Sequence, residues 1–336
     1  MENTDIKIEE EAAAGALKLD LIIPVYKPDI KFKHLIERLK KQKDKPDRII
    51  LLQTVEEEKD RDSRRTEPGQ EYVTYAMELE DSNFRIEFIE VSKKDFDHGA
   101  TRAYGASLSS ADLLMFMTQD AVPSDTHLIS NMKAAFVDTK IAAAYARQLP
   151  REDAGIIESY TRKFNYPEVS STKSLTDLPE LGIKTYFCSN VCAAYRREVY
   201  EGLGGFVKKT IFNEDMIMAA GIIKAGYSIA YTSEAKVYHS HSYTCKEQFK
   251  RNFDLAVSQA DFPEIFSGIK SENEGKKMVL KTSAHLFKSG RFYLLPGLIA
   301  ESGYKYLGYL AGKNYKNLPL SLIKKISMNP SYFNNK

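Results

Sequence analysis

Several features are scarce or absent in this chain of 336 residues, and each absence narrows what the protein can be. Only three cysteines occur, Cys188, Cys192 and Cys245, and no CxxC pair is present. An odd number of cysteines without zinc-type spacing argues against a disulfide framework or a zinc ribbon, so we expect reduced cytoplasmic thiols. No run approaches the ~18 consecutive apolar residues of a membrane span, so no transmembrane helix is predicted.

The amino-terminal stretch MENTDIKIEEEAAAG is acidic and lacks a basic segment followed by an apolar one. It therefore does not resemble a secretory signal, and we expect residues 1–17 to form a flexible leader. Tryptophan is absent, whereas 20 Tyr and 17 Phe are present. Core packing accounts for most of these rings, because 43% hydrophobic and 28% charged residues are ordinary values for a soluble globular protein.

A net charge of +2 excludes a protein that binds nucleic acid through its overall charge, so we expect no nucleic-acid partner. The charge is uneven, since residues 270–336 contain twelve Lys/Arg and three Asp/Glu, which gives +9 there and −7 elsewhere. A basic tail is attracted to anionic surfaces such as lipid headgroups. We therefore expect a cytoplasmic protein whose tail can contact the inner face of the cell membrane. The alternative is a helical tail packed on the domain with a solvated basic face.

The first 120 residues alternate short apolar runs with helical patterns. Short apolar runs predict buried strands, and apolar residues three and four positions apart predict helices. This order predicts an α/β fold with a mostly parallel central sheet flanked by helices. Ligands bind such sheets at the carboxyl ends of the strands, where Pro24–Tyr26 and Asp120 fall. Strands are expected at 17–26, 47–54, 84–92 and 111–120, helices at 29–42 and 99–110, and a solvated loop at 56–71.

The second half of the chain is expected to extend the sheet and then to become helical. Asn213 is a candidate N-cap for a helix that ends at Gly226. A last strand would place His239 and His241 on one face, because alternate residues of a strand point the same way. From Cys245 onward the pattern is helical. Before that point we expect a strand at 141–150, a loop-rich stretch at 150–184, a strand, short helix and glycine turn at 185–206, and a strand at 235–244.

Four features carry side chains suited to chemistry: Asp120, the pair Glu214–Asp215, the pair His239 and His241, and Arg102. Each has an ordinary structural explanation, such as a turn, a polar surface or the favourable placement of acids at a helix N-terminus. Together they suit one reaction. A carboxylate and an imidazole can hold a divalent ion against a diphosphate, and a guanidinium can neutralise that diphosphate. A second carboxylate can act as general base toward an acceptor hydroxyl.

Five motifs occur in order: LIIPVYKP, FDHGATRAYGASLSSADLLMFMTQDAVP, SNVCAAYRREVYEGLGGF, NEDMIMAAGIIKAGYSIAY and VYHSHSYT. This set resembles the family 2 glycosyltransferases with the GT-A fold, and most closely the bacterial branch assigned as rhamnosyltransferases. The resemblance covers residues 19–244. It implies the GT-A nucleotide-diphospho-sugar transferase fold, with a catalytic domain at 18–245 and a basic helical carboxy-terminal extension at 246–336.

The resemblance also implies roles for single residues. Asp120 matches the last acid of the family's DxD motif, whose first acid is Thr118 here. A divalent metal, Mg²⁺ or Mn²⁺, would then rest on Asp120 with His239 or His241. Asp215 matches the catalytic base of the family's xED motif. Residues implied to contact the nucleotide sugar are Pro24, Val25, Tyr26, Gln53, Gly99, Arg102, Gln119, Asp120 and Gly205.

The sequence therefore predicts an inverting, metal-dependent glycosyltransferase. The expected donor is dTDP-L-rhamnose, and the expected acceptor is a growing surface polysaccharide or lipid-linked glycan. One alternative is a UDP-hexose donor. Another is a non-catalytic binding module of the same fold, which Thr118 and Gln53 favour because many relatives carry acids there. A nucleotidyltransferase is disfavoured, because PVYKPDIKFK after the first strand contains no glycine. No oligomeric state follows from the sequence.

Overall fold

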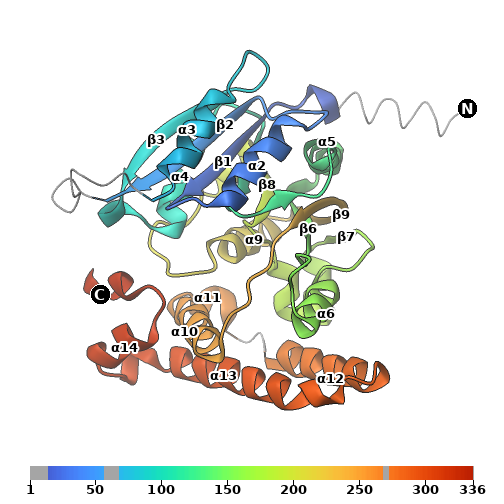
Figure 1. Ribbon diagram of the computed structural model, residues 1–336, viewed down its shortest axis with the longest axis vertical. Helices are drawn as coiled ribbons and strands as arrows, with labels where there is room; N and C mark the ends of the chain where they lie inside the picture. The colour runs from blue at the N-terminus through green and yellow to red at the C-terminus, as the bar shows by residue number, and fades with distance from the viewer. Residues whose placement is uncertain (1–13, 57–67, 268–271, 336) are drawn as a thin grey trace, which may run out of the picture.

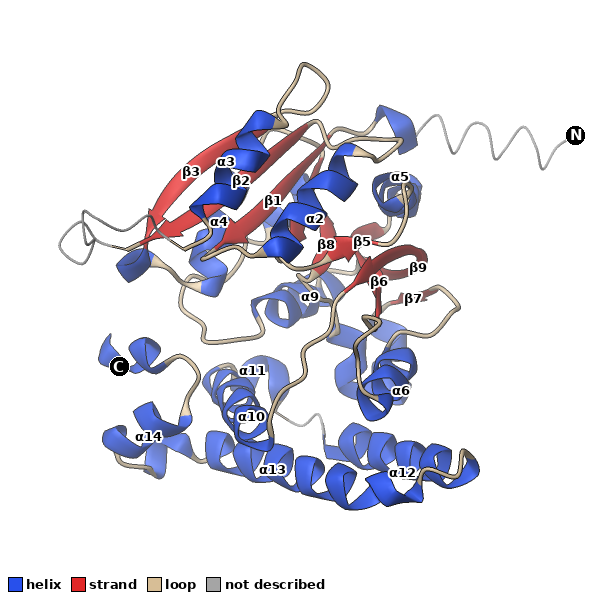
Figure 2. Cartoon of the chain, in the orientation of Figure 1, coloured by secondary structure: helices blue, strands red, loops and turns tan. Residues whose placement is uncertain are grey.

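Nine strands of the described chain form one mixed sheet, with helices on both of its faces (Figures 1 and 2). The structure is a computed structural model that describes residues 14–56, 68–267 and 272–335. The predicted leader at 1–17 and the predicted loop at 56–71 lie mainly outside these ranges. The sheet order is β3-β2-β1-β4-β8-β6-β9-β5, and β7 pairs with β9.

The first four strands are parallel, as predicted. The strands β1, β2 and β4 are runs of Ile, Leu, Met, Phe and Val that are buried on both faces, which is the usual sequence pattern of parallel strands. The carboxyl ends of these strands lie at one edge of the sheet. The four strands are β1 (Leu19–Val25), β2 (Arg48–Val55), β3 (Ile86–Ser92) and β4 (Leu113–Met117).

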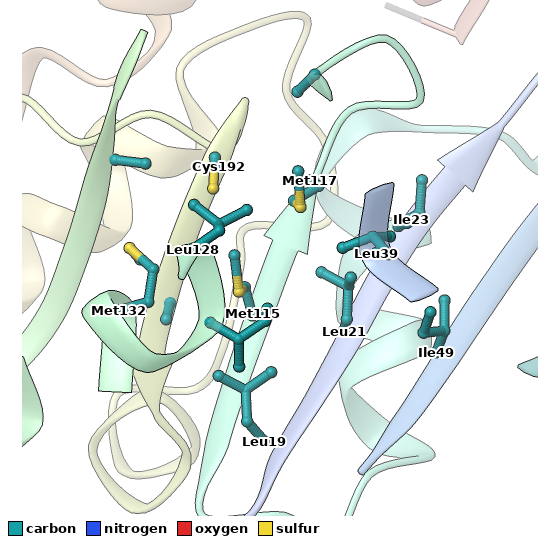
Figure 3. Close-up of a cluster of buried hydrophobic side chains, with 14 of the residues drawn as sticks. Leu19, Leu21, Ile23, Leu39, Ile49, Met115, Met117, Leu128, Met132 and Cys192 are labelled. Atoms are coloured by element: carbon teal, nitrogen blue, oxygen red, sulfur yellow. The ribbon is translucent and has the colours of Figure 1, made fainter. Parts of the chain in front are cut away.

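Alternate residues of β1 point into two separate cores. Leu19, Leu21 and Ile23 pack on the face covered by α2, α3 and α5, and Figure 3 shows Leu21 and Ile23 near Leu39 of α2. Ile22 points into the opposite core, which α4, α8 and α9 cover.

Helix α3 was missing from the sequence prediction. The helices on the two faces are α2 (Ile30–Lys40), α3 (Gln70–Glu78), α4 (His98–Ser107), α5 (Leu128–Ala134), α8 (Arg197–Gly202) and α9 (Glu214–Lys224).

Beyond β4 the sheet becomes mixed. Strand β8 runs antiparallel between β4 and β6, and β6 is parallel to β9. Met117 at the end of β4 pairs with Cys192 at the start of β8, and Leu149 at the end of β6 pairs with Tyr238 at the end of β9. The residues that follow β4, β6 and β9 and those that precede β8 therefore meet at one edge. The strands of this half are β5 (Val122–Pro123), β6 (Ile141–Leu149), β7 (Ser171–Lys173), β8 (Cys192–Arg196) and β9 (Ser228–Tyr238).

The stretch 150–184, predicted to be loop-rich, contains regular structure. Helix α6 (Ile156–Asn165), strand β7 and the short helix α7 (Leu178–Leu181) lie in it. Tyr160 and Phe164 stand four residues apart in α6, which is helical spacing. The flanking polar and proline-containing segments obscured this signal, so the loop prediction was wrong here.

Two further expectations need correction. Strand β9 ends at Tyr238, so His239 and His241 follow the strand and do not lie on its face. Asn213 does precede helix α9, but it has a left-handed φ of 65° and its side chain makes no capping hydrogen bond. Its amide donates to the carbonyl of Leu255 in α10 instead, so Asn213 ties two helices together.

The carboxy-terminal region is helical, as predicted. Thr244 and Glu247 cap the first helix of this region through a reciprocal pair of hydrogen bonds. Figures 1 and 2 show α12, α13 and α14 as the layer farthest from the sheet, with α6 and α10 between them and the sheet. The helices are α10 (Cys245–Asp261), α11 (Pro263–Phe266), α12 (Glu272–Lys288), α13 (Leu295–Lys313) and α14 (Leu320–Ile326).

Helix α13 packs on α10 through two glycines one turn apart. A Cβ atom on Gly308 would lie 2.2 Å from the carbonyl oxygen of Phe249, and one on Gly312 would lie 2.3 Å from that of Phe253. Only glycine permits this approach of one backbone to another. No helix within the described ranges is long and apolar enough to cross a membrane.

Candidate active site

Gln119 joins the tips of the neighbouring strands β1 and β4. Its side-chain oxygen accepts from the backbone N–H of Tyr26 at 2.8 Å, and its amide nitrogen donates to the Tyr26 carbonyl at 3.0 Å. The backbone N–H and carbonyl of Tyr26 are thereby held next to Gln119, and Asp120 is the following residue. The predicted contact of Gln119 with the nucleotide sugar stays a prediction, and in the structure its side chain holds the backbone of Tyr26.

Asp120 lies beside the two histidines that follow β9. Its Oδ2 atom is 3.4 Å from Nε2 of His241 and 3.7 Å from Nε2 of His239. The two Nε2 atoms are 3.1 Å apart. The structure therefore brings the three predicted metal ligands together, although they come from positions more than 100 residues apart in the chain.

The geometry of this cluster suits a divalent metal ion. Two ligand atoms that each lie ~2.1 Å from one ion, at angles of about 90–110°, are roughly 3.0–3.4 Å apart. The three separations in the cluster are within a few tenths of an ångström of that range. Burial lowers the pKa of His239 to about 3 and also lowers that of His241, which keeps both imidazoles neutral and able to donate a lone pair.

Gln148, at the end of β6, orients one of these imidazoles. Arg162 of α6 donates to Gln148 Oε1 at 2.5 Å, which fixes the oxygen end of the amide because a guanidinium can only donate. The same oxygen lies 3.2 Å from Nδ1 of His239, so Nδ1 must carry the proton. The lone pair of His239 is thus on Nε2, which faces Asp120. A hydrogen bond of this kind behind a histidine ligand sets its tautomer and its direction.

Glu214 and Asp215 are adjacent acids at the start of α9 with opposite pKa shifts. Burial raises the pKa of Glu214, but the Arg102 guanidinium 3.2 Å away outweighs burial and holds that pKa below its ordinary value. Burial, together with the charge of Glu214, raises the pKa of Asp215 to about 7. Asp215 can therefore take up or release a proton near neutral pH, which is what a general base must do.

The loop before β8 connects Asp215 to the group formed by Asp120, His239 and His241. The backbone N–H of Asn190 donates to Asp215 Oδ2 at 3.1 Å, and the Asn190 amide donates to Glu214 at 3.3 Å. Ser189, the preceding residue, accepts a hydrogen bond of 3.0 Å from Gln148, the residue that orients His239. The predicted base and the predicted metal ligands therefore belong to one hydrogen-bonded network.

The predicted nucleotide-contacting residues of the first two strands gather at the same edge. Val25 pairs with Gln53 across β1 and β2, and the Gln53 amide donates to Gln70 at 3.1 Å. Beyond them the Tyr26 hydroxyl donates to Glu56 at 2.9 Å. Pro24 precedes Val25 in β1. Sequence reasoning missed Glu56, an acid that follows β2 three residues beyond Gln53.

Gly99, Arg102 and Gly205 stay predictions as ligand contacts, and each has a structural role. A Cβ atom on Gly99 would lie 1.9 Å from the carbonyl oxygen of Val207, so only glycine lets α4 meet that loop. Gly205 has φ +71°, and a Cβ atom there would lie 3.2 Å from the Tyr200 ring. Arg102 is buried, and its guanidinium contacts Glu214 and the backbone of its own helix.

Arg251 of α10 is a second residue that sequence reasoning missed. Its guanidinium lies 4.7 Å from the ring centroid of Phe212 and 5.8 Å from that of Tyr243. Its charge adds to burial in lowering the pKa of both His239 and His241, so it lies near the metal cluster. Among the described residues, aromatic rings hold this cation in place, and they do not neutralise it as a carboxylate would.

Comparisons with known proteins agree with this geometry. The sequence model of glycosyl transferase family 2 matches residues 20–204. The O-antigen chain rhamnosyltransferase RfbN of Salmonella typhimurium is 39% identical over 323 residues, which is 95% of this chain and 97% of RfbN. The O-antigen chain rhamnosyltransferase WbaN of Salmonella anatum is 37% identical over 320 residues, or 94% and 95% of the two chains.

Among solved structures, the mannosyltransferase PcManGT from Pyrobaculum calidifontis, in complex with GDP-Man and Mn²⁺, has a TM-score of 0.57 to this chain. The match covers 90% of this chain and 87% of PcManGT at 13% sequence identity, so it supports the fold alone. The sheet order, the family match and the long alignments to two relatives agree with one another. The chain belongs to glycosyltransferase family 2, has the GT-A fold and is a glycosyltransferase.

Proposed function

We propose that this enzyme transfers L-rhamnose from dTDP-L-rhamnose to a hydroxyl of a growing surface polysaccharide or lipid-linked glycan, with inversion at the sugar carbon. Two relatives named O-antigen chain rhamnosyltransferases, aligned over almost their full length, support the donor and the class of acceptor. The observation that carries the mechanism is the network from Asp215 through Asn190, Ser189 and Gln148 to His239. It supports a base and a diphosphate site that lie at one edge of the sheet.

Asp215 acts as the general base in this proposal. Its pKa of about 7 lets it take the proton of the acceptor hydroxyl as that oxygen attacks the sugar carbon. The bond between that carbon and the diphosphate breaks in the same displacement, and the nucleoside diphosphate leaves with the bonding electrons. Glu214 stays ionised through Arg102 and does not serve as the base.

Asp120, His239 and His241 would hold a divalent metal ion. When bound, the ion neutralises the charge that develops on the departing diphosphate. The two nitrogen ligands favour Mn²⁺ over Mg²⁺, because Mg²⁺ prefers oxygen. Gln148 keeps His239 in the tautomer that the ion requires.

Arg251 is the second cation that we assign to the diphosphate. The resemblance assigned the diphosphate contact to Arg102, but Arg102 forms an ion pair with buried Glu214. Arg251 lies near the two histidines, where aromatic rings hold its guanidinium. On the nucleoside side, Pro24, Val25, Tyr26 and Gln53 line the edge next to Asp120.

A donor panel tests the proposal. The protein is incubated with dTDP-L-rhamnose, a UDP-hexose or GDP-mannose, with and without a lipid-linked glycan acceptor, and free nucleoside diphosphate is measured. We expect acceptor-dependent release of dTDP that Asp215→Asn slows by ~10²–10⁴-fold. Asp138→Asn is the matched control, because Asp138 is an exposed acid that precedes β6, at the opposite edge of the sheet. Faster release of UDP would identify the donor as a UDP-hexose, and no release from any donor would favour a non-catalytic module.

A further inference from the structure

The outermost helices carry several exposed apolar side chains. We call this set, which runs from α12 through the turn at Phe292–Leu294 to α13, the outer face. Large apolar residues are normally exposed singly, whereas a group of them marks an interaction site. Seven of its side chains are more than half exposed: Leu280, Phe287, Phe292, Tyr293, Ile299, Tyr306 and Leu307.

Helical spacing separates this outer face from the packed inner face. On α13, Leu298, Gly308 and Gly312 are buried, and the two glycines lie against α10. Ile299 and Leu307 stand eight residues apart, about 80° from each other around the helix, and both are exposed, unlike the glycines that contact α10. On α12, Leu286 is buried while its neighbour Phe287 is exposed. The inner faces thus hold the helices to the protein, and the outer face remains for another surface.

The exposed charges around the outer face are mainly positive. On α12, Lys276, Lys277 and Lys288 are exposed, and Arg291 precedes the turn. Lys281 is also exposed, but its ammonium lies 5.2 Å from the ring centroid of Phe164 in α6. Two acids of the same region are occupied by partners: Glu274 pairs with Lys184 of the catalytic domain, and Glu301 pairs with Lys305. The outer face therefore presents apolar and basic groups together.

We propose that the outer face docks on an anionic lipid bilayer. Helices with exposed apolar residues flanked by lysine lie in the interface of a membrane, with the apolar side chains at the headgroup boundary and the ammonium groups near anionic lipid. Tyr293 fits this position, since tyrosine favours the boundary between water and lipid. Charge complementarity decides against a second copy of the chain, because a twofold contact through this face would oppose the two sets of lysines.

The position of the outer face gives the contact a consequence for the enzyme. Residues 239–244 lead directly from β9 into α10, and α10 lies on the inner side of α13. A helix with its side chains is about 10 Å across. The metal-binding histidines are therefore separated from the outer face by about one layer of helices, on the side from which a lipid-linked acceptor would come.

Vesicle flotation tests the proposal with the full-length protein. Neutral phosphatidylcholine vesicles are compared with vesicles that also contain phosphatidylglycerol, at low and at high salt. We expect flotation with the anionic vesicles at low salt, and loss of flotation as salt rises. The triple variant Lys276→Gln/Lys277→Gln/Lys288→Gln should bind on the order of 100-fold more weakly, at about fivefold per lysine.

Two further variants make the result specific to the outer face. Phe287→Ser/Leu307→Ser should also lose binding, because it removes apolar contacts without changing the charge. Lys41→Gln/Lys43→Gln/Lys140→Gln removes three exposed lysines elsewhere on the molecule and should bind as the wild type does. Circular dichroism and thermal unfolding check that each variant is folded. Equal binding to neutral and anionic vesicles, an equal loss in the control variant, or self-association that Phe287→Ser/Leu307→Ser abolishes without any vesicle binding would overturn the proposal.

Discussion

The guanidinium of Arg102 lies 3.2 Å from the carboxylate of Glu214, and the side chains of both residues are less than a tenth exposed. This ion pair keeps Glu214 charged inside the protein, and that charge helps to raise the pKa of the adjacent Asp215 to about 7. One buried pair thus separates the protonation of two neighbouring acids. Both the pH dependence of the reaction and the stability of the fold follow from it.

Replacing Asp215 with asparagine should remove the proton acceptor while keeping the shape of the side chain. We expect the turnover rate to fall by ~10²–10⁴-fold and the affinity for the donor to stay nearly constant. In the wild type, the rate should rise with pH through about 7, because only ionised Asp215 can accept a proton. The residual rate of the variant should not show this rise. Steady-state kinetics across pH measure both effects.

The stability of the same variant gives an independent check. The raised pKa means that folded Asp215 holds a proton that the unfolded chain has already released, so the fold loses stability as pH rises toward about 7. The asparagine side chain of the variant does not ionise and carries no such penalty. The melting temperature of the variant relative to the wild type should therefore increase between about pH 5 and about pH 7. In the kinetic test described above, a turnover rate of Asp215→Asn within a fewfold of the wild type would show that Asp215 is only an acid at the end of a helix.

Replacing Arg102 with methionine should leave Glu214 buried and unpaired. Removing one partner of a buried ion pair costs ~3–5 kcal/mol, to be measured by denaturant unfolding. The double variant Arg102→Met/Glu214→Gln should regain part of that stability, since no lone charge remains. It should also move the rise in activity to lower pH, because Asp215 loses its charged neighbour. If Arg102→Met instead raised only the KM for the donor and left stability unchanged, Arg102 would be the diphosphate cation that the resemblance implied.

Metal removal should abolish transfer if the cluster of Asp120, His239 and His241 works as proposed. Activity should vanish in excess chelator and return with a divalent ion, more fully with Mn²⁺ than with Mg²⁺. Asp120→Ala should weaken Mn²⁺ and donor binding together, as titration calorimetry can measure. Separate replacement of each histidine by alanine should weaken Mn²⁺ binding in both cases. Full activity in chelator would refute the metal assignment and make Asp120 a turn residue.

Gln148 should control metal affinity without touching the ion. In Gln148→Met the Nδ1 proton of His239 loses its acceptor, so the imidazole is free to change tautomer. The affinity for Mn²⁺ should fall by ~10–100-fold. Gln148→Glu keeps an oxygen opposite both Arg162 and His239 and should retain most of the affinity. Equal losses in the two variants would show that Gln148 acts by packing alone.

Arg251 should act on the donor rather than on the base. Arg251→Gln should raise the KM for the donor and lower the affinity for free nucleoside diphosphate, with the pH profile unchanged. Arg251→Lys keeps the charge and should show a smaller loss. Calorimetric titration with nucleoside diphosphate provides the measurement. Unchanged diphosphate affinity in Arg251→Gln would reduce Arg251 to a residue that packs Phe212 and Tyr243.

The parallel half of the fold could be predicted because its signals are local. The apolar strands β1, β2 and β4 and the helices α2 and α4 have continuous patterns in the sequence. Direction is not local, which is why antiparallel β8 could not be told from a parallel strand. Helix α6 was missed because the segments on either side of it suggest loops.

The candidate site was predictable where a residue stands at the tip of a strand. Asp120 and the two histidines were found in this way, although the histidines lie beyond β9 and converge on Asp120 through the turn after it. Arg251 and Gln148 carry no local signal. Each becomes part of the site only because α10 and β6 pack beside residues distant in sequence.

The glycine contact between α13 and α10 couples two parts of the molecule mechanically. Backbones that touch at Gly308 and Gly312 have no side chains between them, so we expect α10 and α13 to move together. The segment that carries His241 leads into the amino-terminal end of α10. A displacement of α13 would therefore be passed through α10 to the segment that carries His241. A larger side chain at either glycine would separate the two helices and weaken this coupling.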